Sequence, residues 1–389
     1  MKRGLAAAAL VGAAGLASAE PPSAPRRLVI GAELSAAAGP KDRGFFNYTS
    51  YAESAQRTTR LSLVAEWRIS RQVALLGEVR DENFDHPRVY ALYVRMRPWR
   101  ERAFDVQAGL IPPVFGAFAR RRYGADNPLV GYPLAYQYLT SLRPDAVPGS
   151  AGDLIANRGG GWRVRYPLGV GDPYPAAGLP LANALRWDTG VQARIGSEPL
   201  ELSAALTQGT LSNPRVHDDN GGKQLSARVA WKPVVGLVVG ASGASGRYLS
   251  SRVVRELTTG GERSRQQAAG LDLEYSRDRW ILRSEAVWSR WETPRLEGWL
   301  RALGLATEAR CKLAPGIYAA GRLDHLGFSR IDGPAGPVAW DAPVWRAEAG
   351  LGYTPVRHVL AKLAYQHNWR DGGRVRRRGL ATGQLVLWF

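Results

Sequence analysis

The sequence lacks most features that stabilise or identify a secreted enzyme. Its single cysteine, Cys311, cannot form a disulfide within one chain. Beyond the N-terminal region, no apolar run is long enough to cross a membrane as a helix. The haem-attachment motif C-x-x-C-H, the zinc motif H-E-x-x-H and the serine elbow G-x-S-x-G are all absent. We therefore expect no cofactor, no metal ion and no enzymatic activity.

What is abundant points to an all-β chain. The sequence contains 44 glycines, 13 tryptophans and 15 tyrosines, and turn residues interrupt it at regular spacing. The formal net charge is +18. Such a charge often accompanies nucleic-acid binding. The N-terminus argues against that partner, because it predicts secretion.

The N-terminal residues have the pattern of a secretory signal peptide. Lys2 and Arg3 precede a small-residue apolar run at 5–16, and an A-x-A cleavage pattern occupies 17–19. We expect residues 1–19 to be removed and residues 20–389 to form a single domain.

Alternation of apolar and polar residues predicts the strands. In "LSLVAEWRI", which begins at Leu61, every second residue is apolar, and the same period recurs along the chain. The predicted strands are 28–36, 59–69, 72–81, 89–97, 103–111, 185–195, 199–207, 223–232, 236–247, 266–276, 279–290, 304–313, 316–328, 344–354, 357–369 and 379–389. A further candidate at 159–166 could belong to an additional pair, which would give eighteen strands, or to a long inserted loop. We expect about sixteen strands.

The lengths of the connections identify the kind of sheet. Short turns, such as 70–71 and 277–278, alternate with long loops, such as 37–58, 248–264 and 291–303. Short periplasmic turns and long extracellular loops are typical of a transmembrane antiparallel β-barrel, and an even strand number places both termini in the periplasm. Aromatic residues near strand ends, including Tyr90, Trp187 and Trp345, fit the two interfacial girdles of such a barrel.

The chain ends on "GQLVLWF", an alternating strand with a terminal aromatic residue. This ending resembles the C-terminal signal of Gram-negative outer-membrane β-barrels, which the barrel-assembly machinery reads. The resemblance implies that Phe389, Leu387 and Leu385 form this signal. It also implies a location in the cell outer membrane, in contact with membrane lipid and lipopolysaccharide.

The longest stretch without predicted strands, 112–184, is rich in aromatic residues and proline rather than low in complexity. The stretch "QAGLIPPVFG" at 107–116, which leads from the preceding strand into this segment, resembles the segment that follows a strand in many porins, including the phosphate-selective O/P type. In those porins the loop folds inward and forms the constriction. By this resemblance, five arginines are candidates for the constriction: Arg120, Arg121, Arg122, Arg143 and Arg158. The alternative for the Arg120–Arg122 run is a solvated turn, because runs of charge usually face water.

Charged residues also recur on the polar face of the strands, where basic and acidic residues are nearly balanced. We expect many of them to form cross-strand ion pairs. The predicted basic residues of the pore wall include Arg68, Arg80, Arg95, Arg97, Arg186, Arg194, Arg283 and Arg346. The excess of positive charge lies in loops, where it could attract anions or lipopolysaccharide phosphates.

Three functional hypotheses follow. The first is a porin that allows passive diffusion of small hydrophilic solutes, anionic or neutral, with a bias for anions. The second is a barrel sleeve around a multihaem cytochrome. The third is an outer-membrane enzyme or adhesin. Related porins are often trimers, so a homotrimer is an expected assembly.

Overall fold

A computed structural model describes residues 27–49, 54–99, 103–257, 260–261 and 263–389. The predicted signal peptide, 1–19, lies outside these residues. Sixteen antiparallel strands form one closed barrel, with β1 paired to β20. The barrel strands, in order around the barrel, are β1 (Leu28–Ala38), β2 (Thr59–Arg68), β3 (Val73–Glu82), β4 (Arg88–Met96), β5 (Ala103–Ile111), β8 (Asp188–Ser197), β9 (Leu200–Thr207), β10 (Gln224–Trp231), β11 (Leu237–Arg247), β12 (Arg265–Arg277), β13 (Trp280–Glu292), β14 (Trp299–Ala314), β15 (Ile317–Phe328), β18 (Val344–Tyr353), β19 (Val359–Arg370) and β20 (Arg377–Trp388).

The remaining elements belong to connections between barrel strands. They are η1 (Phe118–Arg121), α2 (Leu134–Gln137), β6 (Ala146–Val147), α3 (Ala151–Ile155), β7 (Val170–Gly171), α4 (Ser251–Glu256), β16 (Arg330–Gly333) and β17 (Gly336–Ala339). None of the helices in the described part of the chain is both long and apolar enough to cross a membrane.

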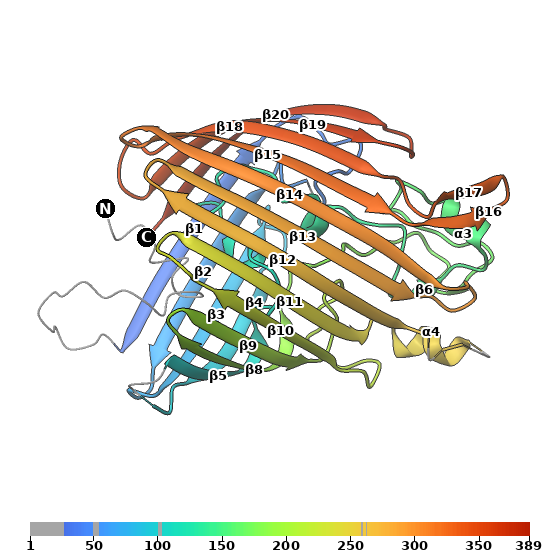
Figure 1. Cartoon of the computed structure of the whole chain (residues 1–389), viewed down its shortest axis with the longest axis horizontal. Coiled ribbons are helices and arrows are strands. Elements are labelled where there is room, and N and C mark those ends of the chain that lie inside the picture. Colours follow the sequence, from blue (N-terminus) through green and yellow to red (C-terminus); the bar gives the residue numbers. More distant parts are fainter. Residues whose placement is uncertain (1–26, 50–53, 100–102, 258–259, 262) are drawn as a thin grey trace, which may run out of the picture.

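The two ends of the barrel differ, as the loop rhythm predicts (Figure 1). Short turns join the strands at the end where the C-terminus lies. The longer connections, with α3, α4 and the β16–β17 hairpin, gather at the other end. We call these the turn end and the loop end.

The barrel buries polar side chains and exposes apolar ones, the reverse of a soluble protein. On β19, for example, Lys362 and Gln366 are buried while Leu363 and Tyr365 are exposed. Strand residues alternate in this way because every second side chain points to the other face of the sheet. The exposed apolar face is the one a bilayer would contact.

The predicted number of sixteen strands is confirmed, and the alternative of eighteen is excluded, because residues 159–166 form no barrel strand and Val164 only makes an isolated bridge to Ala176. Two other sequence predictions about the fold are wrong. The loop predicted at 291–303 is much shorter, because β14 already begins at Trp299. Strand β8 begins at Asp188 rather than at 185, so that Arg186 precedes the strand.

The aromatic girdle is present, with two exceptions. Trp67, Trp280 and Trp345 are exposed on the apolar face. Tyr90 and Trp187 are instead buried and pack against each other, with ring centroids 5.3 Å apart. They belong to the interior cluster beside β3 and β4, and thus to no membrane interface.

Candidate functional site

Ion pairs between different strands line the inner face of the barrel, as the sequence predicts. Arg194 of β8 pairs with Glu201 of the neighbouring β9 at 2.6 Å, and Arg228 of β10 reaches across β11 to pair with Asp272 of β12 at 2.6 Å. Each pair joins side chains that the register places on the same inner face. A charged side chain is stable in a buried position only when it has a partner of opposite charge. These pairs therefore allow the inner face of the closed barrel to carry charged residues.

The segment between β5 and β8 is bound to this wall on several sides. Glu33 of β1 accepts the backbone N–H groups of Gly124 and Ala125, at 2.8 and 3.0 Å. The positively charged Lys362 of β19 binds carbonyl groups of the same turn. Its ammonium group donates to the carbonyl oxygens of Gly124, Asn127 and Leu129, at 2.6, 2.7 and 3.2 Å. One acidic and one basic wall residue therefore satisfy the backbone of the same short turn.

A second anchor holds the backbone of Gly131. Its N–H donates to Glu348 of β18 at 2.9 Å, and its carbonyl accepts from Arg322 of β15 at 2.8 Å. A β-carbon at position 131 would lie 2.5 Å from Nε2 of Gln366 and 2.7 Å from the Glu348 carboxylate, so this close approach favours glycine. Arg346 of β18 donates to the next carbonyl, that of Tyr132, at 2.8 Å.

A third anchor lies on the strands across the barrel. Glu285 of β13 accepts the N–H of Ala117 at 2.9 Å and also the hydroxyl of Tyr136. Ser242 of β11 accepts the N–H of Gly116 at 3.0 Å. The segment 116–136 is thus hydrogen-bonded to strands from β1 to β19.

Two of the three consecutive arginines face this wall. Arg121 pairs with Glu308 of β14 at 3.2 Å, and its side chain is 17% exposed. Arg122 pairs with Glu78 of β3 at 3.3 Å, is 1% exposed and stacks on Tyr90 and Trp187. The solvated-turn alternative is wrong for these two residues. Arg120 lies in η1, and its side chain is outside the described part of the chain.

Arg143 and Arg158 do not join them. Arg143 is fully buried, pairs with Asp145 at 2.8 Å and donates to the carbonyl of Val164 at 3.1 Å, so it holds the segment together from within. Arg158 donates to the carbonyl of Asp371 at 3.2 Å, in the loop between β19 and β20.

All but one of the arginines predicted for the wall lie on its inner face or at its turn end. Arg80 pairs with Glu78, Arg95 with Glu66, and Arg283 with both Glu274 and Glu308. Arg68 also pairs with Glu66 but is 46% exposed at the end of β2. Arg97 lies just after β4 and is half-buried.

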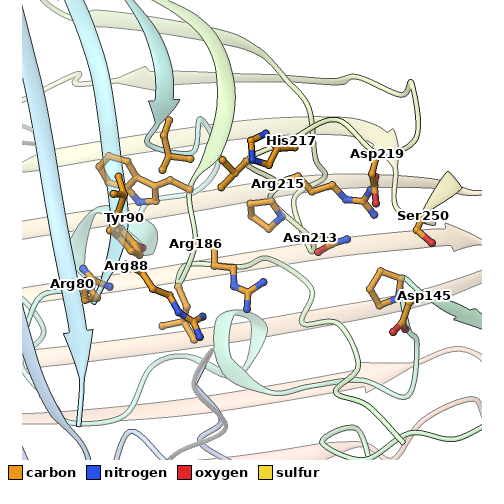
Figure 2. Close-up of a pocket in the computed structure, with 17 residues that line it drawn as sticks. Arg80, Arg88, Tyr90, Asp145, Arg186, Asn213, Arg215, His217, Asp219 and Ser250 are labelled. Atoms are coloured by element: carbon orange, nitrogen blue, oxygen red, sulfur yellow. The ribbon is translucent and has the colours of Figure 1, made fainter. Parts of the chain in front are cut away.

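Arg186 is not on the wall but lines a cavity of about 560 Å³ at the loop end (Figure 2). Arg80 and Arg88 line it as well, and the register places these two directly opposite each other on β3 and β4. Arg215 and His217 come from the β9–β10 loop. The carboxylates in the lining are those of Asp145, which pairs with Arg143, and Asp219, which pairs with Arg215.

The floor of this arginine-lined cavity is aromatic and apolar. Tyr90, Leu110, Leu185 and Trp187 contribute to it. The indole Nε1 of Trp187 is buried and has no hydrogen-bond partner among the described residues. The cavity therefore combines cationic groups with an apolar and aromatic surface. No pattern in the sequence predicts this cavity, because its lining comes from seven separate parts of the chain.

Asp126 is the acidic residue of the segment 112–184 whose pKa is raised most clearly. Burial and the neighbouring Glu33 carboxylate raise the pKa of Asp126 to about 7, against the opposing influence of Arg283 and Lys362. Its charge therefore changes near neutral pH.

The C-terminal residues complete the barrel. The backbone N–H of Phe389 donates to the carbonyl of Ala32 at 3.1 Å, which continues the β1–β20 pairing. Leu385, Leu387 and Phe389 are exposed on the outer face. That they form an assembly signal stays a prediction.

The arrangement of the chain is similar to that of solved outer-membrane proteins. An anion-selective porin from Comamonas acidovorans matches with a TM-score of 0.57 and 10% identity, over 93% of this chain and 99% of that one. OmpF of Salmonella typhi, in a complex with daunomycin, matches with a TM-score of 0.56 and 12% identity, over 93% and 97%. The chain has the fold of the outer-membrane porins. The trimer form of OmpT, an outer membrane protein of Vibrio cholerae, gives a TM-score of 0.54 at 10% identity, over 93% and 99%.

At such low identity the likeness establishes the porin fold and not the solute. No protein-family model and no curated protein sequence matches the chain. Within the described residues, no group of acidic, histidine or cysteine side chains could hold a metal ion. The porin fold and the exposed apolar face together support the outer-membrane location that the sequence predicts.

Proposed function

We propose that the protein is an outer-membrane channel for passive diffusion of small hydrophilic solutes, with a bias for anions. The observation that carries the proposal is the arginine-lined cavity at the loop end of a closed barrel with a polar inner face. Arg88 and Arg186 line this cavity, and both are exposed. Rings of arginine select for anions.

We further propose that the segment 112–184 narrows the lumen, with Arg121 and Arg122 at the constriction. The wall contacts of Gly124, Gly131 and Tyr136 support this role, because they come from strands on several sides of the barrel. Several carboxylates lie beside these arginines, so the constriction adds rigidity and the cavity supplies most of the charge bias.

A homotrimer is part of the proposal, in keeping with the trimer form among the similar structures. Contacts with the barrel-assembly machinery and with lipopolysaccharide also belong to it. The cytochrome sleeve and the enzyme or adhesin stay predictions of the sequence, and no observation on the described residues favours them.

The test is a planar-bilayer recording under a salt gradient. We expect open steps whose reversal potential lies toward that of chloride. The variant R88E/R186E should lower the chloride preference several-fold, because it reverses two charges at the mouth. The matched control is R277E/R279E, which changes the same net charge in an exposed turn at the opposite end.

The outcomes separate the parts of the proposal. A cation preference of the unmodified protein would contradict the anion bias but would still agree with a channel function. A folded barrel without conductance would contradict the channel itself. An equal effect of both variants would show that overall charge, and not the cavity, sets the bias.

A further inference from the structure

Three consecutive residues before β8 form one side of the arginine-lined cavity. Leu185 and Trp187 are buried and contribute to its floor, whereas Arg186 between them is exposed. Asn183 fixes this turn, because its side-chain oxygen accepts the backbone N–H groups of Leu185 and Arg186, at 2.8 and 3.1 Å. Apolar and cationic residues thus alternate along one short, hydrogen-bonded stretch of the lining.

The β9–β10 loop forms another side of the cavity. The backbone N–H of Arg215 donates to Asp188 of β8 at 3.1 Å, which binds this loop to the strand that follows the turn. Val216 comes directly after Arg215, lines the cavity and is 54% exposed. In Figure 2, Arg186 extends into the space between Arg88 and this loop. Cationic and apolar groups therefore line the same space from two connections of the barrel.

The floor of the cavity is held in place by contacts within the protein. The hydroxyl of Tyr90 donates to the carbonyl of Ala184 at 2.8 Å. The Arg80 guanidinium lies 3.7 Å from the ring centroid of Tyr90 and pairs with Glu78 at 2.8 Å. Because the Tyr90 hydroxyl and the Arg80 guanidinium already have partners, the floor supplies mainly apolar and aromatic surface to a ligand.

The lining of the cavity carries an excess of positive charge. It contains four arginines and two carboxylates, and each carboxylate is paired with an arginine, Asp145 with Arg143 and Asp219 with Arg215. A positive lining favours an anion, and a guanidinium group binds a carboxylate through two parallel hydrogen bonds. The volume of about 560 Å³ lies within the range of sites for small organic molecules, roughly 300–1,000 Å³. A bare inorganic anion would leave most of this space empty.

We propose that the cavity binds an organic anion in which a carboxylate is attached to an apolar ring, that is, an aromatic carboxylate. This inference rests on the proposed channel function and adds the class of solute to it. The carboxylate would bind at Arg88 and Arg186, and the ring would pack on Leu185 and Val216. An inorganic anion would meet the same charges but would bury no apolar surface, and burial of apolar surface favours association.

The experiment uses the full chain refolded in detergent, with benzoate as the probe. Saturation-transfer NMR measures binding, and acetate, inorganic phosphate and benzyl alcohol serve as competitors. Benzoate should bind roughly tenfold more tightly than acetate, because removal of about 60 Å² of ring surface from water gives that factor. Benzyl alcohol, which has the ring without the charge, and phosphate, which has the charge without the ring, should both compete weakly.

Two variants separate the contributions of charge and of apolar surface. R88Q/R186Q should weaken benzoate binding by about tenfold, because it removes two charged hydrogen-bond donors. The matched control is R277Q/R279Q, which removes two arginines from an exposed turn at the other end of the barrel and should leave benzoate binding unchanged.

V216S should weaken benzoate binding by about threefold and acetate binding much less, because only the ring uses the apolar surface of Val216. Its matched control is V235S. Val235 is fully exposed in the turn between β10 and β11, at the turn end, so the same substitution there should not change the binding of either anion.

Two results would overturn the proposal. One is equal affinity of the unmodified protein for benzoate and acetate. The other is benzoate binding that neither R88Q/R186Q nor V216S weakens, which would locate the ligand outside the cavity. The shift in gel mobility on heating reports whether each variant is folded, and V216S carries the test if the arginine variant is not.

Bilayer recordings of the same preparation distinguish this inference from the proposed function. Open steps with a chloride preference, together with equal binding of benzoate and acetate, would overturn the class of ligand and support the channel. Selective benzoate binding by a folded barrel that does not conduct would support the ligand site and overturn the channel.

Discussion

Arginines on the two faces of the same barrel differ in every respect but their charge. Arg322, on the inner face of β15, is completely buried and lies within 3.3 Å of carboxylate oxygens of Glu308, Asp324 and Glu348. Arg301, on the outer face of the neighbouring β14, is exposed and forms no ion pair within the described residues.

The difference shows what each face demands. The inner face is crowded by the segment 116–136, so water cannot solvate each guanidinium, and carboxylates must take its place. The outer face at the loop end lies at a boundary where water or lipid phosphate can solvate a charge. An arginine on the inner face therefore needs a carboxylate partner for stability. An arginine on the outer face does not, and its guanidinium group is available to bind an anion.

The largest expected effect comes from removing an inner arginine. R322A would leave Glu348 and Asp324 as buried charges without their partner and would release the carbonyl of Gly131. We expect a loss of about 3–5 kcal/mol in the free energy of unfolding. Denaturant titration of the protein in vesicles measures it.

The control for this loss is R68A, because Arg68 pairs with Glu66 at an exposed strand end. Its removal should cost no more than about 1 kcal/mol. Similar losses for both variants would contradict the distinction between the buried and the exposed arginines.

The next effect concerns the anchor of the segment. K362M removes the ammonium group that three carbonyls share and keeps a side chain of similar length. We expect a loss of about 1–3 kcal/mol for the carbonyls left unpaired. Because the segment is then less firmly held, single-channel recordings should show larger and more variable open steps.

If K362M conducts in uniform steps of unchanged size, Lys362 does not hold a constriction. K312M is a suitable control, since Lys312 is exposed near the turn end of β14.

A smaller effect follows from Asp126. With a pKa of about 7, its carboxyl is neutral below that pH and negatively charged above it. As the pH falls from about 8 to about 6, the chloride preference should therefore rise, by about twofold for one charge in a wet lumen.

D126N should abolish this change and show the higher chloride preference at both pH values. The reversal potential at each pH measures it. A pH dependence that persists in D126N would assign the titration to another group.

The smallest effect is expected at the outer face. Without lipid, R301Q should change the free energy of unfolding in detergent by no more than about 0.5 kcal/mol, because the Arg301 side chain is exposed and forms no ion pair within the described residues. A loss comparable to that of R322A would mean that Arg301 has a structural partner and would remove the contrast between the two faces.

The sequence predicted the barrel well, since alternation with period two follows from the geometry of a strand. Fifteen of the strands could be located from it to within a few residues, as with 103–111, which is the extent of β5. The predicted strand began at 304, whereas β14 begins at Trp299. The turn residues Pro294 and Gly298 lie just before Trp299, and the loop was therefore predicted to extend beyond them. That error concealed Arg301.

The candidate site was predicted only in part. The segment 112–184 could be recognised by its length and by the stretch 107–116 that leads into it. The sequence could not predict which of its arginines meet the wall, because their partners are fixed by the folding of the segment and not by the residues beside them. Arg143 turns into the segment and Arg121 toward Glu308, a residue far along the chain.

By itself, the sequence determined that this chain would form a closed barrel with a polar inside and an apolar outside, because alternation and turn spacing are local properties. Only the tertiary structure decided which charges meet. The register brings Arg290 opposite Arg301 on the outside, and the folding of the segment brings Gly131 between Arg322 and Glu348 on the inside. Contacts of this kind join distant residues, and no local pattern of residues records them.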